Sequence, residues 1–129
     1  MLNKSNERSL RRFVFVLRKP FLSDAINKIA FQGVPGAYSH MSCQAVKPDM
    51  EAIACASFED MLNEVEEGRA GLAMVPVENS IAGRVADIHH LLPSSGLYIT
   101  GEHFQRVNHH IMAPRGAKLE DLTHVHSHA

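Results

Sequence analysis

Residues 51–77, EAIACASFEDMLNEVEEGRAGLAMVPV, decide the fold of this chain. Residues 52–56 and 71–77 are short and almost continuously apolar, which is typical of strands buried on both faces of a sheet. The stretch between them predicts a helix, because Ser57 can cap its start and Gly68 can end it. Its apolar residues, such as Met61 and Val65, recur at helical spacing. The stretch therefore predicts a strand–helix–strand unit with parallel strands.

The pattern continues on both sides of this unit. Upstream, residues 29–31 predict a buried strand that ends at a Gly- and Pro-rich loop, and residues 37–46 predict a helix. Downstream we expect a polar loop at 78–83, a helix at 84–92, one long or two linked strands at 97–112, a helical turn at 118–122 and a strand from Val125. The fold class is α/β, with a parallel sheet covered on both faces. Ligands of such sheets bind at the carboxyl ends of the strands, where the loops 33–39 and 78–83 fall.

The first 28 residues differ from the rest in charge. Residues 1–29 carry seven Lys or Arg against two acidic residues, which gives +5, so the remainder sums to -6 in a chain of net charge -1. We expect residues 1–28 to be a poorly ordered basic leader; an organelle transit peptide is the alternative. The apolar run 13–17 is too short for the h-region of a signal peptide. The body has no basic cluster, which argues against binding to nucleic acid.

Polar residues gather in the two loops at the expected ligand-binding edge. Glycines in the loop 33–39 permit a sharp turn, and the following helix directs free N–H groups toward a carboxylate or phosphate. Glu78, Asn79 and Ser80 follow a buried strand, where they could hold a small polar ligand. The alternative is structural: the glycines serve the turn alone, and Asn79 and Ser80 form a turn and cap the next helix.

Five segments, in order along the chain, resemble motifs of the prephenate dehydratase catalytic domain. They are the loop 33–39, Ser57-Phe58-Glu59-Asp60, the stretch 75–83 (VPVENSIAG), Gly101-Glu102, and Val125-His126-Ser127-His128. VPVENSIAG is similar to the Pro-Ile-Glu-Asn-Ser signature of that family. The resemblance covers residues 29–129.

The resemblance implies a two-lobed fold similar to type II periplasmic binding proteins, with the substrate between the lobes. The first lobe would span about 29–105, and about 106–129 would begin a second lobe that is truncated. The family converts prephenate to phenylpyruvate, carbon dioxide and water without a cofactor or metal, in phenylalanine biosynthesis in the cytoplasm. By this resemblance the substrate-binding candidates are Glu78, Asn79 and Ser80, with Ser39 and Tyr38 as weaker ones.

The chain departs from the family in one respect that bears on activity. The Thr-Arg-Phe motif, which carries the family's essential Thr and Arg, has no counterpart, so we name no catalytic residue and expect little or no activity from this chain alone. Expected partners are prephenate and either a second copy or a polypeptide that supplies the second lobe, but no membrane. Two other functions stay open: arogenate dehydratase, and a module that binds a small carboxylate without chemistry.

Cysteine and histidine offer weaker signals. Cys43 and Cys55 are too few for a disulfide scaffold and are typical of buried thiols in a reducing compartment. His124, His126 and His128 alternate and could share one face of a strand, as a zinc or nickel site requires. The resemblance to the family already accounts for Ser127-His128 as strand residues, so we predict no physiological metal site.

Overall fold

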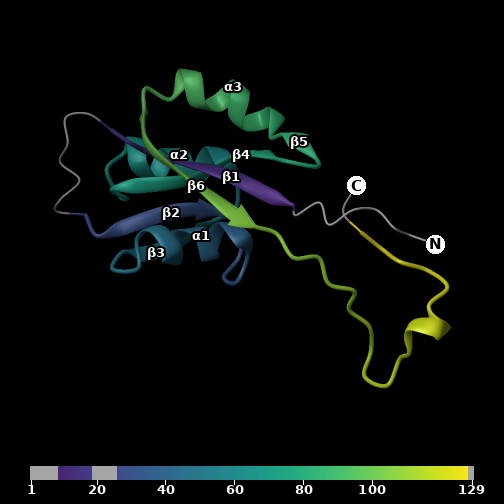
Figure 1. The fold of residues 1–129 in the computed structure, drawn as a ribbon. Coiled ribbons are helices and arrows are strands. Elements are labelled where there is room, and N and C mark those ends of the chain that lie inside the picture. The colour runs from purple at the N-terminus through teal and green to yellow at the C-terminus, as the bar shows by residue number, and fades with distance from the viewer. Residues whose placement is uncertain (1–8, 19–25, 128–129) are drawn as a thin grey trace.

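The computed structural model of the protein describes residues 9–18 and 26–127, which form one mixed sheet with helices on both faces (Figure 1). In chain order the elements are β1 Leu10–Leu17, β2 Lys28–Gln32, α1 Tyr38–Val46, β3 Glu51–Cys55, α2 Phe58–Glu66, β4 Leu72–Asn79, β5 Gly83–Arg84, α3 Ala86–Ser94, β6 Tyr98–Arg106 and a 3-10 helix, Leu119–Asp121. The strand order is β3-β2-β4-β1-β6, and β5 pairs with β4.

The strand–helix–strand pattern predicted from the sequence is confirmed for β2, β3 and β4. Both β3 and β4 pair with β2 in parallel. The predicted cap of α2 is also present, since Ser57 Oγ accepts a hydrogen bond from the backbone N–H of Asp60 at 3.0 Å. Gly68, just after the helix, has a φ of 75°, a left-handed conformation that glycine adopts without strain.

The prediction of a poorly ordered leader over residues 1–28 is wrong for Leu10–Leu17, which form β1. This strand lies inside the sheet, antiparallel to β4 on one side and to β6 on the other. Its apolar residues alternate between the two faces, and Phe13 and Val16 are completely buried. An apolar run such as residues 13–17, whose side chains are buried on both faces, is typical of a strand inside a sheet. The leader residues 1–8 and 19–25 lie outside the described residues, and the boundary between two lobes stays a prediction.

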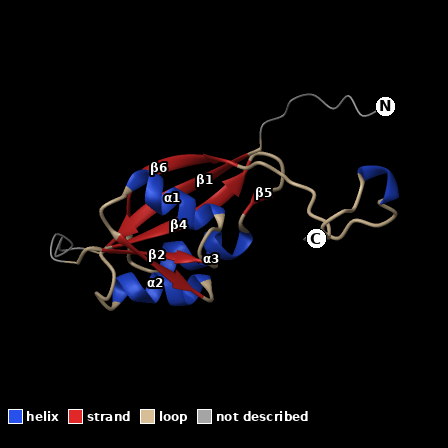
Figure 2. Cartoon of the chain, turned by 90° about the horizontal axis from the view of Figure 1, so that it is seen from below, coloured by secondary structure: helices blue, strands red, loops and turns tan. Residues whose placement is uncertain are grey.

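The helix α1 covers one face of the sheet, and α2 and α3 cover the other (Figure 2). Each face carries one apolar core. Val14 and Val16 of β1 belong to the core under α2 and α3, whereas Phe13 and Leu17 belong to the core on the α1 face. Phe15 lies over Gly101 of β6 so closely that a Cβ at that position would overlap its ring. The parallel sheet expected from the sequence is therefore extended by an antiparallel half, β1 and β6.

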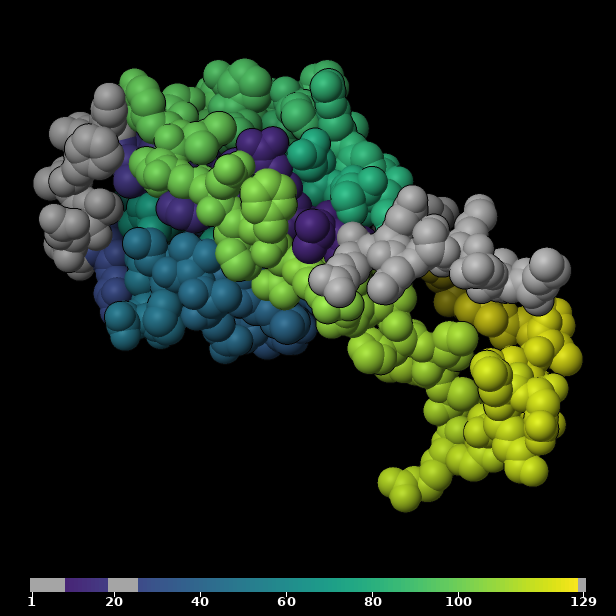
Figure 3. Space-filling model, in the orientation of Figure 1, coloured from purple at the N-terminus to yellow at the C-terminus, as the bar shows by residue number. Residues whose placement is uncertain are grey.

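The C-terminal quarter differs most from the sequence-based expectation. Regular pairing of β6 ends at Arg106, so the predicted strand 97–112 is half as long, and residues 122–127 form no strand. The helical turn predicted at 118–122 is confirmed as the 3-10 helix. Residues 109–127 extend away from the sheet (Figures 1 and 3) and expose Met112 and Leu119. No helix among the described residues is long and apolar enough to cross a membrane.

Candidate functional site

The predicted site residues lie at the edge of the sheet where β2 and β4 end. Glu78 and Asn79 were predicted in a loop, but they are the last residues of β4 and pair with β1 and β5. Tyr38 and Ser39 begin α1, which follows the end of β2 and contacts both β4 and β6. The fold therefore brings the two predicted loops to the same edge, as expected for parallel strands.

Asn79 and Ser80 use their side chains to hold the backbone in place. Asn79 Oδ1 accepts hydrogen bonds from the N–H groups of Ile81 at 2.8 Å and Ala82 at 3.0 Å. Ser80 Oγ accepts from the N–H of Leu10 at 2.9 Å, and the Ser80 N–H donates to the Leu10 carbonyl, also at 2.9 Å. The Asn79 contacts form the turn of the structural alternative, but neither residue caps α3, which begins without a side-chain cap. These hydrogen bonds also make the turn rigid, so that the neighbouring Glu78 is held in a fixed place.

Glu78 is one member of a charged row that crosses three strands on the α3 face. Arg12 of β1 lies between Glu78 of β4, at 3.4 Å, and Glu102 of β6, at 2.9 Å. The guanidinium also lies 6.0 Å from the centre of the Phe104 ring. Hydrogen bonding and attraction to Glu102, and then to Glu78, raise the pKa of Arg12. The Arg12–Glu78 contact is long for a charge-assisted hydrogen bond, so a ligand could replace it at small cost.

Tyr38 is half-buried and Ser39 is buried at the start of α1. The Tyr38 hydroxyl donates to the carbonyl of Asn108 at 2.6 Å and accepts from its N–H at 2.8 Å. It therefore anchors the chain where it leaves β6. Ser39 is buried, with 5% of its surface exposed. No side chain caps the start of α1, so its first N–H groups are not taken by a capping residue.

Sequence reasoning missed Arg12 because it lies in the segment taken for a leader. Arg12 and Glu78 are separated by 66 residues in the sequence, and only the pairing of β1 with β4 brings them together. The arginine pair directly before the continuous apolar run 13–17 was the available signal.

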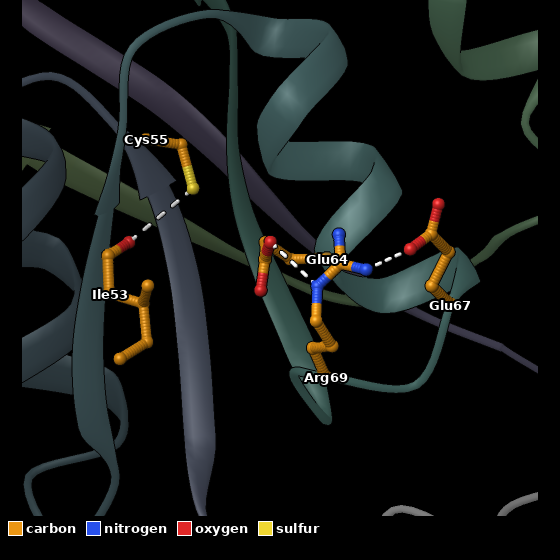
Figure 4. Close-up of polar contacts among 5 residues, drawn as sticks. All are labelled: Ile53, Cys55, Glu64, Glu67 and Arg69. Carbon is orange, nitrogen blue, oxygen red and sulfur yellow. Dashed lines mark hydrogen bonds and ion pairs between the residues drawn. The ribbon is translucent and has the colours of Figure 1, made fainter.

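A second polar cluster, between β3 and α2, has a structural explanation (Figure 4). Arg69 forms ion pairs with Glu64, at 2.9 Å, and with Glu67. The Cys55 thiol donates to the Ile53 carbonyl at 3.8 Å, and burial, followed by the nearby Glu64 and Asp60, raises its pKa. A hollow of about 340 Å³ lies beside these residues. A thiol whose pKa is raised by burial and nearby carboxylates is not an activated nucleophile.

The alternating histidines are not brought together with other ligands. Among residues 9–18 and 26–127, no group of three or more His, Cys, Asp or Glu side chains is placed to hold a metal ion. His124 and His126 lie on the extended C-terminal segment, and His128 lies outside the described residues. The metal hypothesis therefore gains no geometric support from the described part of the chain.

Comparisons with known proteins first identify the class of fold to which the chain belongs. A solved structure of the arginine-binding protein ArgBP from T. maritima superposes with a TM-score of 0.51 at 17% identity, covering 76% of this chain and 43% of that one. At this identity the likeness concerns the fold alone. The chain is thus an α/β lobe of the type seen in amino-acid-binding proteins, which confirms the predicted fold class.

The family follows from closer matches. The family model for prephenate dehydratase matches residues 29–129. A bifunctional N-acyl-homoserine lactone acylase/prephenate dehydratase of Komagataeibacter europaeus is 50% identical over 100 residues, covering 78% of this chain and 36% of the relative. Arogenate dehydratase 2 of Petunia hybrida is 37% identical over 101 residues, covering 78% and 26%.

A solved structure supports the same assignment. The structure described as GqqA, a novel type of quorum quenching acylases, has a TM-score of 0.59 at 54% identity and covers 63% of this chain and 42% of that one. The chain belongs to the prephenate dehydratase family. It spans less than half the length of each of these relatives.

Proposed function

We propose that this chain forms the first lobe of a dehydratase that converts prephenate to phenylpyruvate, carbon dioxide and water. The observation that carries the proposal is the family's Glu-Asn-Ser segment, Glu78 to Ser80, at the carboxyl edge of the sheet with Arg12 beside it. The family match covers this segment but not Arg12, which lies before residue 29.

The chemistry asks little of the protein beyond holding charge and assisting one leaving group. Loss of the ring carboxylate and the hydroxyl makes the ring aromatic, so the site must orient the carboxylate and donate a hydrogen bond or proton to the hydroxyl. Glu78, which pairs with Arg12, is the candidate that orients the substrate hydroxyl by accepting a hydrogen bond from it, and the turn at Asn79 and Ser80 positions Glu78. Arg12 is the added candidate, because a guanidinium donates to a carboxylate in a planar fork.

The weaker candidates keep a smaller part in this proposal. Ser39 lies at the start of α1, where backbone N–H groups favour an anion. Tyr38 would contact substrate only by releasing Asn108, so we assign it to holding the chain between the lobes.

A complete site needs a second wall, which we propose comes from a second-lobe polypeptide or from another copy of the chain. One lobe leaves the carboxyl edge of the sheet open to water, which weakens every electrostatic contact there. As part of the same proposal the protein works in the cytoplasm. The two free cysteines, Cys43 and Cys55, support this location because unpaired thiols persist in reducing compartments.

Arogenate is the alternative substrate, since several relatives are named arogenate dehydratases. It differs from prephenate in bearing an amino group where prephenate bears a keto group. A binding module without chemistry is the other alternative. In either case the ligand would bind at the carboxyl edge of the sheet. Titrations with prephenate and with arogenate identify the ligand, and a turnover assay distinguishes an enzyme from a binding module.

The name of one relative and one groove on the surface favour a second candidate activity. The Komagataeibacter relative is named as an N-acyl-homoserine lactone acylase as well. Between α3 and the sheet lies a groove of about 440 Å³, lined by Arg12, His89 and apolar residues such as Leu92 and Ile99. An acyl chain fits such an apolar surface. Release of homoserine lactone from an acylated substrate by the purified chain would test this activity, and no release would exclude it.

The proposed function is tested by mapping substrate binding on the ¹⁵N-labelled chain by NMR. We expect prephenate to shift the backbone signals of residues 78–82 and of the first turn of α1. The matched control is the exposed segment 111–117, which should not move. The Glu78→Gln variant should lose the shifts while keeping its folded spectrum. If prephenate shifts no signal at the carboxyl edge in a folded wild-type chain, the proposal fails.

A further inference from the structure

Two consecutive arginines of β1 lie on opposite faces of the sheet and have opposite electrostatic surroundings. Arg12 lies on the α3 face and is neutralised by Glu78 and Glu102. Arg11 lies on the other face, in register with Asn79 of β4 and Gln105 of β6. That face is covered by α1, because Phe13, two residues further along β1, packs in the core that contains Cys43 of α1.

Arg11 has no partner among the described residues. It forms no ion pair or hydrogen bond within residues 9–18 and 26–127, although its side chain is half-buried. Its Nε atom is fully buried and makes no hydrogen bond. In this part of the chain no other buried side-chain nitrogen or oxygen lacks a partner.

The two residues in register with Arg11, Asn79 and Gln105, carry no negative charge that could neutralise it. Gln105 is neutral and contacts His103 at 3.3 Å and the backbone of Arg106 at 3.2 Å. The Asn79 amide is used by the turn and by Ser9. Folded proteins rarely leave a buried donor unpaired, and a half-buried cation without a counter-ion is costly. Neither Asn79 nor Gln105 therefore neutralises the charge of Arg11.

We propose that Arg11 is an anion-binding residue that takes a carboxylate of a small ligand on the α1 face of the carboxyl edge. The guanidinium fork fits the two oxygens of a carboxylate. In the proposed function the ligand would be the substrate, so the identity of the ligand rests on that function, whereas the anion site does not. Arg11 and Glu78 would then approach the ligand from the two faces of the same sheet edge.

The experiment measures dissociation constants by NMR titration of the full chain with two probes, prephenate and malonate. Arg11→Gln removes the charge, Arg11→Lys keeps the charge but loses the fork, and Arg115→Gln is the control because Arg115 is exposed on the C-terminal segment. We expect Arg11→Gln to raise the Kd by about 10-fold or more, Arg11→Lys to raise it less, and the control to match wild type.

The outcomes separate this inference from the proposed function. Malonate binding that depends on Arg11, without prephenate binding, supports the anion site and overturns the proposed substrate. Prephenate binding with the same Kd in Arg11→Gln overturns the anion site and leaves the proposed function standing. If neither probe binds the folded wild-type chain, the anion site is overturned. Because Arg11→Lys retains the charge, it preserves the test if Arg11→Gln does not fold.

Discussion

Truncating Phe13 to alanine should remove a large part of the protein's stability. The Phe13 side chain is completely buried in the core on the α1 face, where it packs with residues that include Phe31 and Met74. Phe→Ala changes at such positions cost about 3–5 kcal/mol, because apolar burial is lost and a cavity remains. A small domain has about 5–15 kcal/mol in total, so the variant should be marginal.

Urea unfolding followed by circular dichroism measures this loss. With a slope of about 1–3 kcal/mol per molar urea, the midpoint should fall by roughly 1–5 M. Phe104→Ala is the matched control, since the same side chain on β6 is 53% exposed; its cost should stay below about 1 kcal/mol. Equal and small effects of the two variants would refute the placement of β1 inside the sheet.

Three further changes probe other parts of the structure. Gly101→Ala should cost about 1–3 kcal/mol, because its Cβ would overlap the Phe15 ring; thermal unfolding measures this, and Phe15→Ala in the same chain should restore part of the loss. Ser57→Ala should cost about 1 kcal/mol by removing the cap of α2, whereas no change in urea midpoint would show that the cap is dispensable. Cys43 should resist iodoacetamide at pH 8 in the native state and react in urea, because burial raises the pKa of its thiol to about 12; mass spectrometry would detect native labelling, which would contradict its burial.

The parallel half of the fold could be predicted because its signals are local. The apolar runs that became β2, β3 and β4 are bounded by turn residues, and the helix between β3 and β4 begins at Ser57 with a recognisable cap. The run that became β3 is as apolar as those of β2 and β4, but β3 lies at the edge of the sheet and exposes Ala54, so continuous apolar character predicted the strand and not its burial. The boundaries were less accurate, since β4 continues to Asn79 and α3 begins at Ala86.

The antiparallel half could not be predicted because its pairing is not local. The strand β1 is flanked by arginines, and nothing near it in the sequence indicates that it pairs with β4 and β6. The location of Glu78 to Ser80 at the carboxyl edge followed from the strand before it. The contacts of Arg12 and Tyr38 could not be predicted in this way, because each joins segments at least 66 residues apart in the sequence.

The proposed function predicts that residues 29–129 supply one lobe of a dehydratase site and that turnover needs a second lobe. The most direct test is the rate of phenylpyruvate formation from prephenate by the purified chain, with and without an added polypeptide that carries the second lobe of a relative. We predict turnover only when both are present, and its loss in the Glu78→Gln variant. Turnover by the chain alone would contradict the need for a second lobe, and silence of the mixture with both components folded would contradict the assigned function.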